Sequence, residues 1–465
     1  MREVAIIGAG PSGAAAAIEL LQRNIQVTLL DEQHRPGGQI YRNVTQTAPA
    51  VAKVLGKDYI SGKPLMSNLL EMAKSLEHLT YHTDAVVWSV DRTREICWRS
   101  GGKSYSKIFD AVILATGALE RPMPMPGWTL PGVMTAGAAQ IIMKSGGQAL
   151  GNSVLLGSGP LLYLVAHQMA QLGRAPKAIL DTSTFLDEFK AAKHLRPDAT
   201  TCKYLVKGMG LLVELKKAGV KRIRGVENAE IKESERGLDV FFSVDGKSQR
   251  LSCEHLLLHA GVVPNTQITR ALDAEHDWDE SNLCFNPRTT YSGALQDIDG
   301  FWVSGDGVNI MGAEAAAIRG RSAALDICQY LGVDIASKRN DSSDLNFARY
   351  VPIRKFLNQA YLPKQWFLTP PLNTIVCRCE EVTAAEIKTA FDQGAQGPNQ
   401  AKAFTRCGMG ACQGRYCGLT VSNIFAQARN ISPSSVGYYR IRTPIKPVRL
   451  GELASHEHHH KTQTL

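Results

Sequence analysis

Short apolar runs recur along the chain, and several lead through a glycine-rich turn into a helix-like pattern of hydrophobic positions. The first run, residues 4–7, is followed by Gly-Ala-Gly-Pro-Ser-Gly at residues 8–13 and by an Ala-rich helical pattern as far as Leu21. A second run, residues 27–30, ends on Asp31. This order predicts a βαβ unit, the context in which Gly-x-Gly-x-x-Gly binds the diphosphate of a dinucleotide.

Each glycine of this turn has its own expected role. Gly8 would form the tight turn, Gly10 would let the backbone approach a diphosphate, and Gly13 would let the helix pack closely on the strand. The diphosphate would lie at the helix N-terminus, where unpaired N–H groups and the positive end of the dipole favour an anion. The nucleotide-binding candidates of this unit are Gly8, Gly10, Pro11, Ser12, Gly13, Asp31 and Glu32.

A second βαβ unit is predicted from residue 153. Its first run leads into a turn with Gly157 and Gly159, and its second run ends on Asp181. Leu162 occupies the third glycine position, where a side chain should push the helix away from the strand and weaken the phosphate site. Three interpretations stay open: an NAD(P) site, a site for another adenine nucleotide, or a fold kept as a scaffold. If a nicotinamide nucleotide binds, Asp181 favours NAD, because a carboxylate repels the 2′-phosphate of NADP.

The same pattern predicts further elements. Alternating apolar positions indicate a small β segment between residues 86 and 105, and residues 111–114 indicate a buried strand that ends in a small-residue turn. Residues 300–307 predict a strand ending on an acid between glycines, and a small-residue helix begins near residue 312. A linker with one amphipathic helix is expected at residues 337–372.

The ten cysteines are distributed unevenly. Five are dispersed and are expected to be buried small hydrophobic residues, whereas the other five lie in one short C-terminal stretch. The clustered five are Cys377, Cys379, Cys407, Cys412 and Cys417. Thiolates from two loops can converge on one metal centre, but the spacing differs from the Cys-x2–4-Cys pairs of structural zinc sites. A [2Fe-2S] cluster is favoured, with a zinc ion and inert thiols as alternatives. Arg378, Arg406 and Arg415 would offset the negative charge of an all-thiolate cluster.

Composition and charge limit the function classes. A chain of 465 residues with 44% hydrophobic residues predicts about three domains with sizeable cores. The net charge of +9 comes from scattered Lys and Arg, which favours a solvated surface or an acidic protein partner over nucleic acid. The first strand begins by Val4, which leaves no room for a signal peptide, and no apolar stretch approaches the length of an integral membrane span. We therefore expect a cytoplasmic protein, with peripheral membrane association through a partner left open.

Residues 35–42 contain Gly-Gly-Gln at 37–39 and lie just beyond the predicted ribose-binding acid, where they cannot form a regular helix. The chain also contains an Ala-Thr-Gly turn at residues 115–117 and Gly-Asp-Gly at residues 305–307. Together with the first βαβ unit and this loop, these segments resemble those of the two-dinucleotide-fold flavoproteins of the thioredoxin reductase type. The resemblance implies bound FAD, with Gly38 and Gln39 near the ribityl chain and isoalloxazine and Asp306 on a ribityl hydroxyl. It also implies FAD contacts at Val86, Ala115, Thr116, Gly117, Gly305 and Ala313.

The cysteine-rich stretch resembles the small [2Fe-2S] domain of the bacterioferritin-associated ferredoxin type. That domain is fused to FAD proteins that form one subunit of hetero-oligomeric amine and amino-acid dehydrogenases, a family that includes opine oxidase, hydrogen cyanide synthase and D-hydroxyproline dehydrogenase. The resemblance covers nearly the whole chain. It implies a catalytic flavoprotein partner, and a further candidate partner is a small ferredoxin-like subunit. It implies cluster ligation by Cys377, Cys379, Cys412 and Cys417, with Cys407 as the alternative ligand.

We therefore expect an α/β fold with two Rossmann-like dinucleotide-binding domains and a small helical [2Fe-2S] domain. The expected borders are 1–149 and 267–336 for the FAD domain, 150–266 for the second domain, 337–372 for the linker, 373–430 for the cluster domain and 431–465 for the tail.

The leading functional hypothesis is an oxidoreductase subunit that relays electrons from a partner oxidising an amino acid, an opine or a related secondary amine such as D-hydroxyproline. Two alternatives are a self-sufficient NAD(P)H-dependent reductase and a non-catalytic docking subunit. Because no Cys-x-x-Cys lies beside either dinucleotide unit, a disulfide reductase is disfavoured. No acid–base dyad stands out from the pattern, so no catalytic residue is assigned.

Overall fold

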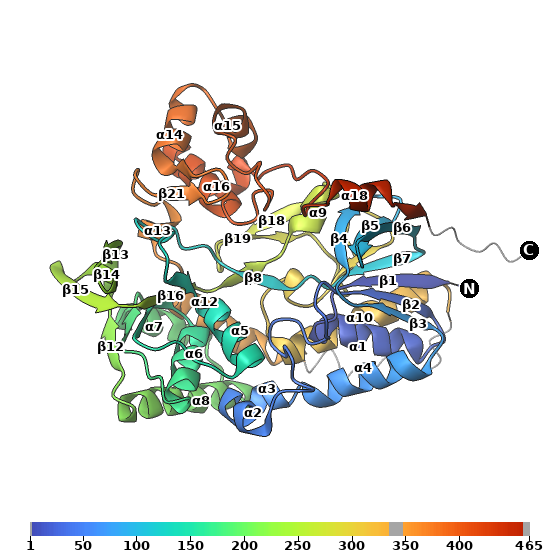
Figure 1. Ribbon diagram of the computed structural model, residues 1–465, viewed down its shortest axis with the longest axis horizontal. Coiled ribbons are helices and arrows are strands. Elements are labelled where there is room, and N and C mark those ends of the chain that lie inside the picture. Colours follow the sequence, from blue (N-terminus) through green and yellow to red (C-terminus); the bar gives the residue numbers. More distant parts are fainter. Residues whose placement is uncertain (1, 334–346, 459–465) are drawn as a thin grey trace, which may run out of the picture.

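The computed structural model describes residues 2–333 and 347–458 and contains two parallel five-stranded sheets (Figure 1). The first sheet has the order β20-β7-β1-β2-β3, and each neighbouring pair is parallel. Because β20 returns from near residue 300 to pair with β7, this unit is discontinuous in sequence. Its strands are β1 (Glu3–Ile7), β2 (Gln26–Leu30), β3 (Leu79–His82), β7 (Ala111–Leu114) and β20 (Phe301–Val303).

Two helices with small side chains cross over this sheet. Helix α1 (Pro11–Leu21) follows β1 through the glycine turn, and it packs against α10 (Ala313–Tyr330) and α4 (Lys63–Ser75). A Cβ at Gly320 of α10 would lie 2.0 Å from the carbonyl oxygen of Ser12, so the two helices approach at a position that only glycine can occupy. The short helices α2 (Pro49–Leu55) and α3 (Lys57–Ile60) precede α4.

The second sheet has the order β12-β11-β10-β16-β9 and is also parallel throughout. Strand β9 (Val133–Thr135) and helix α5 (Ala136–Gly146) belong to this unit and lie ahead of the expected border at residue 150, because β9 pairs with β16 (His255–Ala260). The other elements are β10 (Ser153–Ser158), α6 (Pro160–Gln171), β11 (Ala178–Asp181), α7 (Phe185–Ala191), α8 (Ala199–Lys217) and β12 (Lys221–Arg224). An antiparallel sheet, β13 (Val226–Ser234), β14 (Gly237–Val244) and β15 (Lys247–Cys253), is inserted before β16.

Two antiparallel strands connect the units. The chain leaves the first sheet through β8 (Ala118–Glu120) and returns through β17 (Val262–Pro264), which pairs with β8. After β17 come α9 (Gln267–Ala271) and the hairpin of β18 (His276–Asp279) and β19 (Cys284–Pro287), which lie below the C-terminal domain (Figure 1).

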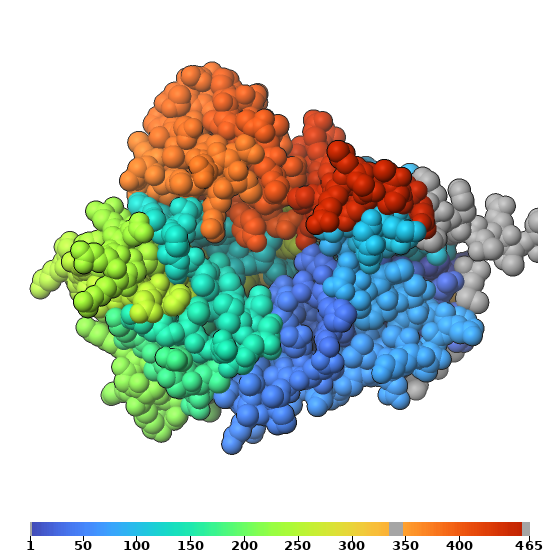
Figure 2. Space-filling model, viewed as in Figure 1, coloured from blue at the N-terminus to red at the C-terminus, as the bar shows by residue number. Residues whose placement is uncertain are grey.

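The predicted β segment near residue 86 forms part of a separate four-stranded sheet. Strands β4 (Val86–Val90), β5 (Glu95–Ser100) and β6 (Lys103–Ile108) form a meander, and β23 (Glu457–His458) adds to β6. The backbone N–H of Ile445 also donates to the Trp88 carbonyl at 2.8 Å, so the C-terminal tail runs back over the first unit. Figure 2 shows this red tail lying against the blue half of the molecule.

The cysteine-rich region forms a small helical domain. It contains the hairpin β21 (Ile375–Cys377) and β22 (Val382–Thr383), followed by α14 (Ala384–Asp392), α15 (Pro398–Thr405), α16 (Gly418–Arg429) and α17 (Pro433–Val436). It stands as a separate lobe above the two dinucleotide units (Figure 2).

Part of the expected linker, residues 337–346, lies outside the described residues, as do the end of the expected FAD domain at 334–336 and the last residues of the tail. The amphipathic helix expected in the linker corresponds to α12 (Val351–Ala360), which is followed by α13 (Gln365–Leu368). The last helix is α18 (Leu450–Ala454). Among the helices of the described ranges, none combines the length and apolarity that a membrane span requires.

Candidate functional site

The first glycine turn has the geometry expected of a diphosphate site. Gly8 has φ +106, and a Cβ there would lie 2.5 Å from the Ala115 carbonyl oxygen. A Cβ at Gly13 would lie 1.8 Å from the Gly8 carbonyl oxygen, so the helix packs on the turn as predicted. At Gly10 the nearest atom to an added Cβ is the Gly38 Cα at 3.8 Å, which leaves the space above the turn open. These residues therefore fit the diphosphate of a dinucleotide.

Two contacts secure the N-terminus of α1, where Pro11 occupies the first turn. The Ser12 hydroxyl donates to the Ser304 hydroxyl at 2.7 Å, and a Cβ at Gly305 would lie 2.8 Å from the Ser12 Cβ. The segment after β20 thus lies directly on the diphosphate turn. Both ends of the discontinuous unit consequently meet at the predicted flavin site.

Asp31 lies at the carboxyl end of β2, as predicted, and is buried. Its carboxylate accepts the backbone N–H of Ala9 at 2.5 Å and that of Gln33 at 2.6 Å. Burial raises the pKa of Asp31 to about 6, although the two N–H groups act in the opposite direction. The neighbouring Glu32 is exposed and forms an ion pair with Lys446 of the C-terminal tail. The tail therefore covers the edge of the site where the adenosine ribose is expected.

The Gly-Gly-Gln loop faces the glycine turn. Gly38 has φ +57 and lies opposite Gly10, while the carbonyl oxygen of Gln39 accepts a hydrogen bond from Lys144 of α5 at 2.8 Å. Lys144 also donates to Gln140 at 2.9 Å and is buried, and burial lowers the pKa of its ammonium group to about 7. Lys144 of the second unit therefore fixes the Gly-Gly-Gln loop of the first unit through a hydrogen bond.

The Ala115-Thr116-Gly117 turn connects to the returning segment. The Thr116 hydroxyl donates to the Asn265 carbonyl at 3.2 Å, and the Asn265 N–H donates to the Gly117 carbonyl at 3.0 Å. Asp306, the acid between glycines, accepts the N–H groups of Met311 at 2.9 Å and Gly312 at 3.1 Å, which positions the start of α10 at Ala313. Val86 lies in β4 and pairs with Arg99, and it directly follows Ala85, whose N–H donates to the Asp31 carbonyl at 2.8 Å.

The second glycine turn has different chemistry. Gly157 and Gly159 have φ +136 and +115, and Leu162 is completely buried behind them. Asp181 is also completely buried, and its carboxylate accepts the Tyr163 hydroxyl, the Ser183 hydroxyl at 2.7 Å and the Arg222 guanidinium at 2.7 Å. A ribose would have to displace these partners before it could bind to Asp181.

One buried pair escaped the sequence analysis. His259, at the end of β16, has its Nδ1 2.7 Å from a carboxylate oxygen of Glu120, whose other oxygen accepts the Gly137 N–H at 2.9 Å. The His259 ring lies against Gly159, at 3.4 Å from an added Cβ. The pair therefore ties β8, α5 and the second glycine turn together, which identifies a structural role for this histidine.

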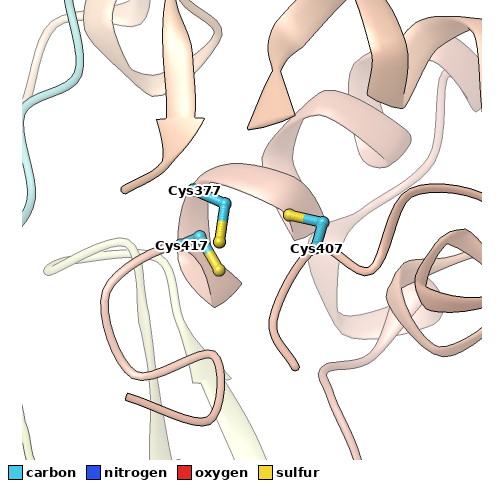
Figure 3. Close-up of side chains that lie close together, drawn as sticks. All are labelled: Cys377, Cys407 and Cys417. Carbon is cyan, nitrogen blue, oxygen red and sulfur yellow. The ribbon is translucent and has the colours of Figure 1, made fainter. Parts of the chain in front are cut away.

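Three of the five clustered cysteines converge. The sulfurs of Cys377, Cys407 and Cys417 all lie within 4.8 Å of one another and are buried (Figure 3). Hydrogen bonds from the Cys407 and Cys417 thiols, together with the N–H groups of Gly408 and Glu380, lower the pKa of Cys377 far below its usual range. Backbone N–H groups directed at a thiolate are typical of iron–sulfur ligation. The arrangement therefore fits a metal site.

The other two cysteines form a second pair toward the surface. The sulfur of exposed Cys379 is within hydrogen-bonding reach of the thiol and the backbone N–H of Cys412, and burial against this loop raises the pKa of the Cys379 thiol. Cys377 and Cys379 come from the β21–β22 hairpin, whereas Cys412 and Cys417 come from the loop before α16. The outer pair therefore combines one sulfur from each loop. Within the buried group, Cys377 and Cys417 do the same.

A glutamine of the flavin unit contacts the loop that carries Cys412. The Gln267 side-chain amide donates to the Gln413 carbonyl at 3.1 Å and to the Cys412 carbonyl at 3.5 Å. Gln267 begins α9, two residues after Asn265, which binds the Thr116-Gly117 turn. A short segment therefore joins the predicted flavin turn to the outer cysteine pair.

Sequence analysis missed Gln267 and Tyr439. The Tyr439 hydroxyl donates to the Cys407 sulfur at 3.2 Å, and its ring fills the space above Gly408 and Gly414. The closely spaced glycines of the loop were the available signal, because they indicate that something bulky packs against this backbone. No pattern in the sequence identifies which residue that is.

Comparison with known proteins agrees with this architecture. Residues 2–319 match the family described as pyridine nucleotide-disulphide oxidoreductase, and residues 373–457 match the sarcosine oxidase A3 domain. The L-proline dehydrogenase structure from P. horikoshii superposes with a TM-score of 0.69 at 20% identity, covering 97% of this chain and 79% of that one. This likeness confirms the predicted two-dinucleotide fold.

Sequence relatives extend along the whole chain. An opine oxidase subunit of Agrobacterium tumefaciens is 40% identical, over 98% of this chain and 92% of that protein. The hydrogen cyanide synthase subunit HcnB of Pseudomonas aeruginosa is 30% identical, over 95% of this chain and 96% of that protein. The chain therefore belongs to this family of opine oxidase subunits, whose members are flavoprotein oxidoreductases built on the two-dinucleotide fold.

Proposed function

We propose that this chain is the FAD- and [2Fe-2S]-containing electron-transfer subunit of a hetero-oligomeric dehydrogenase or oxidase. The complex would act on an amino acid, an opine or a related secondary amine, with substrate oxidation in the partner subunit. Relatives in opine oxidase, hydrogen cyanide synthase and sarcosine oxidase support this substrate class. The observation that carries the proposal is the connection from the Thr116-Gly117 turn through Asn265 and Gln267 to the Cys412 loop.

The first unit would hold FAD through its turn and its acids. Gly10 leaves space for the diphosphate, Asp31 supplies an acceptor for the ribose, and Asp306 fixes the loop that begins α10. The N-terminus of α10 would add its dipole at the pyrimidine end of the flavin. Bound FAD supplies two-electron chemistry and a [2Fe-2S] cluster supplies one-electron chemistry, so a chain that holds both can divide an electron pair.

Four cysteines would hold the cluster as two pairs. Cys377 and Cys417 form a buried pair, while Cys379 and Cys412 form a pair nearer the surface. One iron would bind each pair, so that both loops contribute to both irons. Cys407 lies beside the buried pair and accepts the Tyr439 hydroxyl, which makes it a neighbour of the cluster in this assignment.

The second glycine turn favours electron supply by the partner over supply by NAD(P)H. Asp181 is already paired with Arg222 and Tyr163, and Leu162 fills the third glycine position. We expect anaerobic NADH or NADPH to leave the flavin absorbance of the purified chain unchanged. A panel of opines and secondary amino acids added to the intact complex should bleach it. Rapid bleaching of the isolated chain by either nucleotide would establish the self-sufficient reductase instead.

An apolar surface on the second unit supports a permanent partner. Phe185 and Phe189 of α7 are 77% and 80% exposed, and α8 exposes Val206, Met209 and Val213 along one face. Both helices belong to the left half of Figure 1, with α8 below α7. These five exposed apolar side chains, here called the α7–α8 surface, favour a subunit interface over a solvated face.

Charge around this patch indicates the kind of partner. Lys190 and Lys193 follow Phe189 along the chain and Lys216 lies on α8, and no carboxylate of the described residues forms an ion pair with any of the three. Two such lysine-rimmed faces would repel each other, which argues against a second copy of this chain. We therefore assign the α7–α8 surface to an acidic-rimmed face of the catalytic partner.

Replacing Met209 and Val213 by glutamate should detach the partner. Burying two unpaired charges in the interface should weaken the complex at least about 100-fold, while the exposed position of both residues should leave folding and flavin content intact. The measurement is recovery of the catalytic subunit with the tagged chain from its native cell. Leu450→Glu, at a residue 85% exposed on α18, is the matched control. Equal recovery with the double variant and the control would refute this interface.

A further inference from the structure

A small cavity lies between the flavin unit and the cysteine domain. Its volume is about 20 Å³, enough for a group slightly larger than one water molecule. One wall consists of the segment entering α9, with Asn265, Thr266 and Arg270, and the opposite wall consists of Arg415 and Tyr438 from the cysteine domain. Figure 1 shows β19 below the lobe that contains α16, and α9 to the right of that lobe.

Two guanidinium groups line this cavity with unused donors. Arg270 donates through Nε to the Thr266 hydroxyl at 3.2 Å, but its Nη2 is inaccessible to solvent and has no hydrogen-bond partner among the described residues. Arg415 reaches the Ile445 carbonyl at 3.5 Å through Nη2, and its Nε is likewise buried without a partner in the part of the chain that the structure describes.

The Arg270 side chain is held rigidly in place. Its guanidinium lies between the Tyr438 ring at 3.9 Å and the Phe285 ring at 4.7 Å. Burial lowers the pKa of Arg270 to about 10, so the group still carries its charge at neutral pH. Its direction is therefore fixed by the two rings and the Thr266 hydroxyl, independently of any ligand.

No carboxylate is among the described residues that line the cavity. The charged residues of the lining are the cations Arg270 and Arg415. Each half-buried arginine keeps one inaccessible N–H group without an acceptor among the described residues. An inaccessible donor on a charged group is costly to leave unpaired, whereas a guanidinium binds a planar oxyanion through paired N–H groups. The unpaired N–H donors, the positive charge and the small volume of the cavity favour one small planar oxyanion. A nucleotide is too large for this volume, and the two arginines would repel a metal cation.

We propose that this cavity binds a small planar oxyanion of the carboxylate type, held by Arg270 from the flavin unit and Arg415 from the cysteine domain. Because the two arginines come from different units, the anion would join the flavin half to the cysteine domain beside the Gln267 contact. This proposal does not depend on the substrate or on the identity of the metal centre.

The test is titration of ¹³C-labelled formate into the full-length protein with its cofactors bound, in a chloride-free gluconate buffer of constant ionic strength. Protein-dependent line broadening should saturate with a Kd on the order of 1 mM, close to the limit for a ligand with about three non-hydrogen atoms. Arg270→Gln and Arg415→Gln should each raise this Kd at least about tenfold, since each removes a charge-assisted hydrogen bond.

Arg440→Gln is the matched control, because Arg440 is an exposed arginine of the neighbouring segment that pairs with Asp273 at 3.5 Å. It should bind formate as the unmodified protein does. Flavin and iron contents identify any variant that fails to fold, and Arg415→Gln decides the question if Arg270→Gln does not fold. Broadening that does not saturate by about 50 mM, or an unchanged Kd in a folded arginine variant, would overturn the proposal.

Discussion

Cys412→Ser should yield a yellow protein that has lost nearly all of its iron. The Cys412 thiol lies beside Cys379 in the outer pair, whereas the spare thiol of Cys407 lies with Cys377 and Cys417. A serine hydroxyl is a far poorer ligand than a thiolate for iron–sulfur clusters. We expect the iron content per flavin to fall at least about tenfold and turnover of the complex with its natural acceptor to fall at least about 100-fold.

Two control variants make this result specific. Cys407→Ser should keep its iron, because the proposed ligand set does not include Cys407 even though its sulfur lies near Cys377 and Cys417. Cys202→Ser, at an exposed and dispersed thiol, should behave as the unmodified protein does. Iron-free Cys407→Ser together with iron-replete Cys412→Ser would replace the proposed set with one built on the buried triad. Unchanged turnover in an assembled but iron-free complex would make the chain a docking subunit.

Gly10→Ala should fold normally and bind little FAD. Gly10 has φ −72, a backbone conformation open to alanine, and an added methyl would approach nothing closer than 3.8 Å. The same methyl would occupy the space in which the diphosphate is expected to meet the backbone. Crowding of this kind costs about 1–3 kcal/mol, so the Kd for FAD should rise about 10- to 100-fold.

The measurement is flavin content after dialysis, followed by reconstitution with FAD and a circular dichroism spectrum. Gly208→Ala is the matched control, because Gly208 lies in exposed α8 and an added Cβ there meets nothing within 4 Å. Gly13→Ala differs from both: its methyl would lie 1.8 Å from the Gly8 carbonyl and should destabilise the fold itself. Full FAD retention in Gly10→Ala would mean that the diphosphate binds elsewhere.

Local patterns predicted the parts of the structure that depend on neighbouring residues. The β1–α1–β2 unit could be predicted because its strands, turn and helix are contiguous in sequence, and the close approach of Gly13 to Gly8 lies within that stretch. Thr383-x-x-Glu386 is a local signal of the same kind for the start of α14, where both hydrogen bonds of the capping box form. In each case the sequence separation is short, so the geometry follows from the local chain.

Contacts between segments that are distant in sequence could not be predicted from local patterns. Strand β9 joins the second sheet because Val133 pairs with Leu256, and nothing near residue 133 indicates that partner. The cysteine spacing predicted convergence on a metal centre, but the pairing of Cys377 with Cys417 depends on how the β21–β22 hairpin packs against α16. Gln267 and Tyr439 were missed for the same reason, since each acts through a contact with a loop that is distant in sequence.

Electron paramagnetic resonance of the anaerobically purified chain, combined with iron, sulfide and flavin analysis, tests the central claim most directly. The account predicts about one flavin, two iron atoms and two acid-labile sulfides per chain, and a single unpaired spin on the iron centre after dithionite reduction. Yellow protein that contains zinc, or no metal, and gives no iron signal on reduction would contradict it.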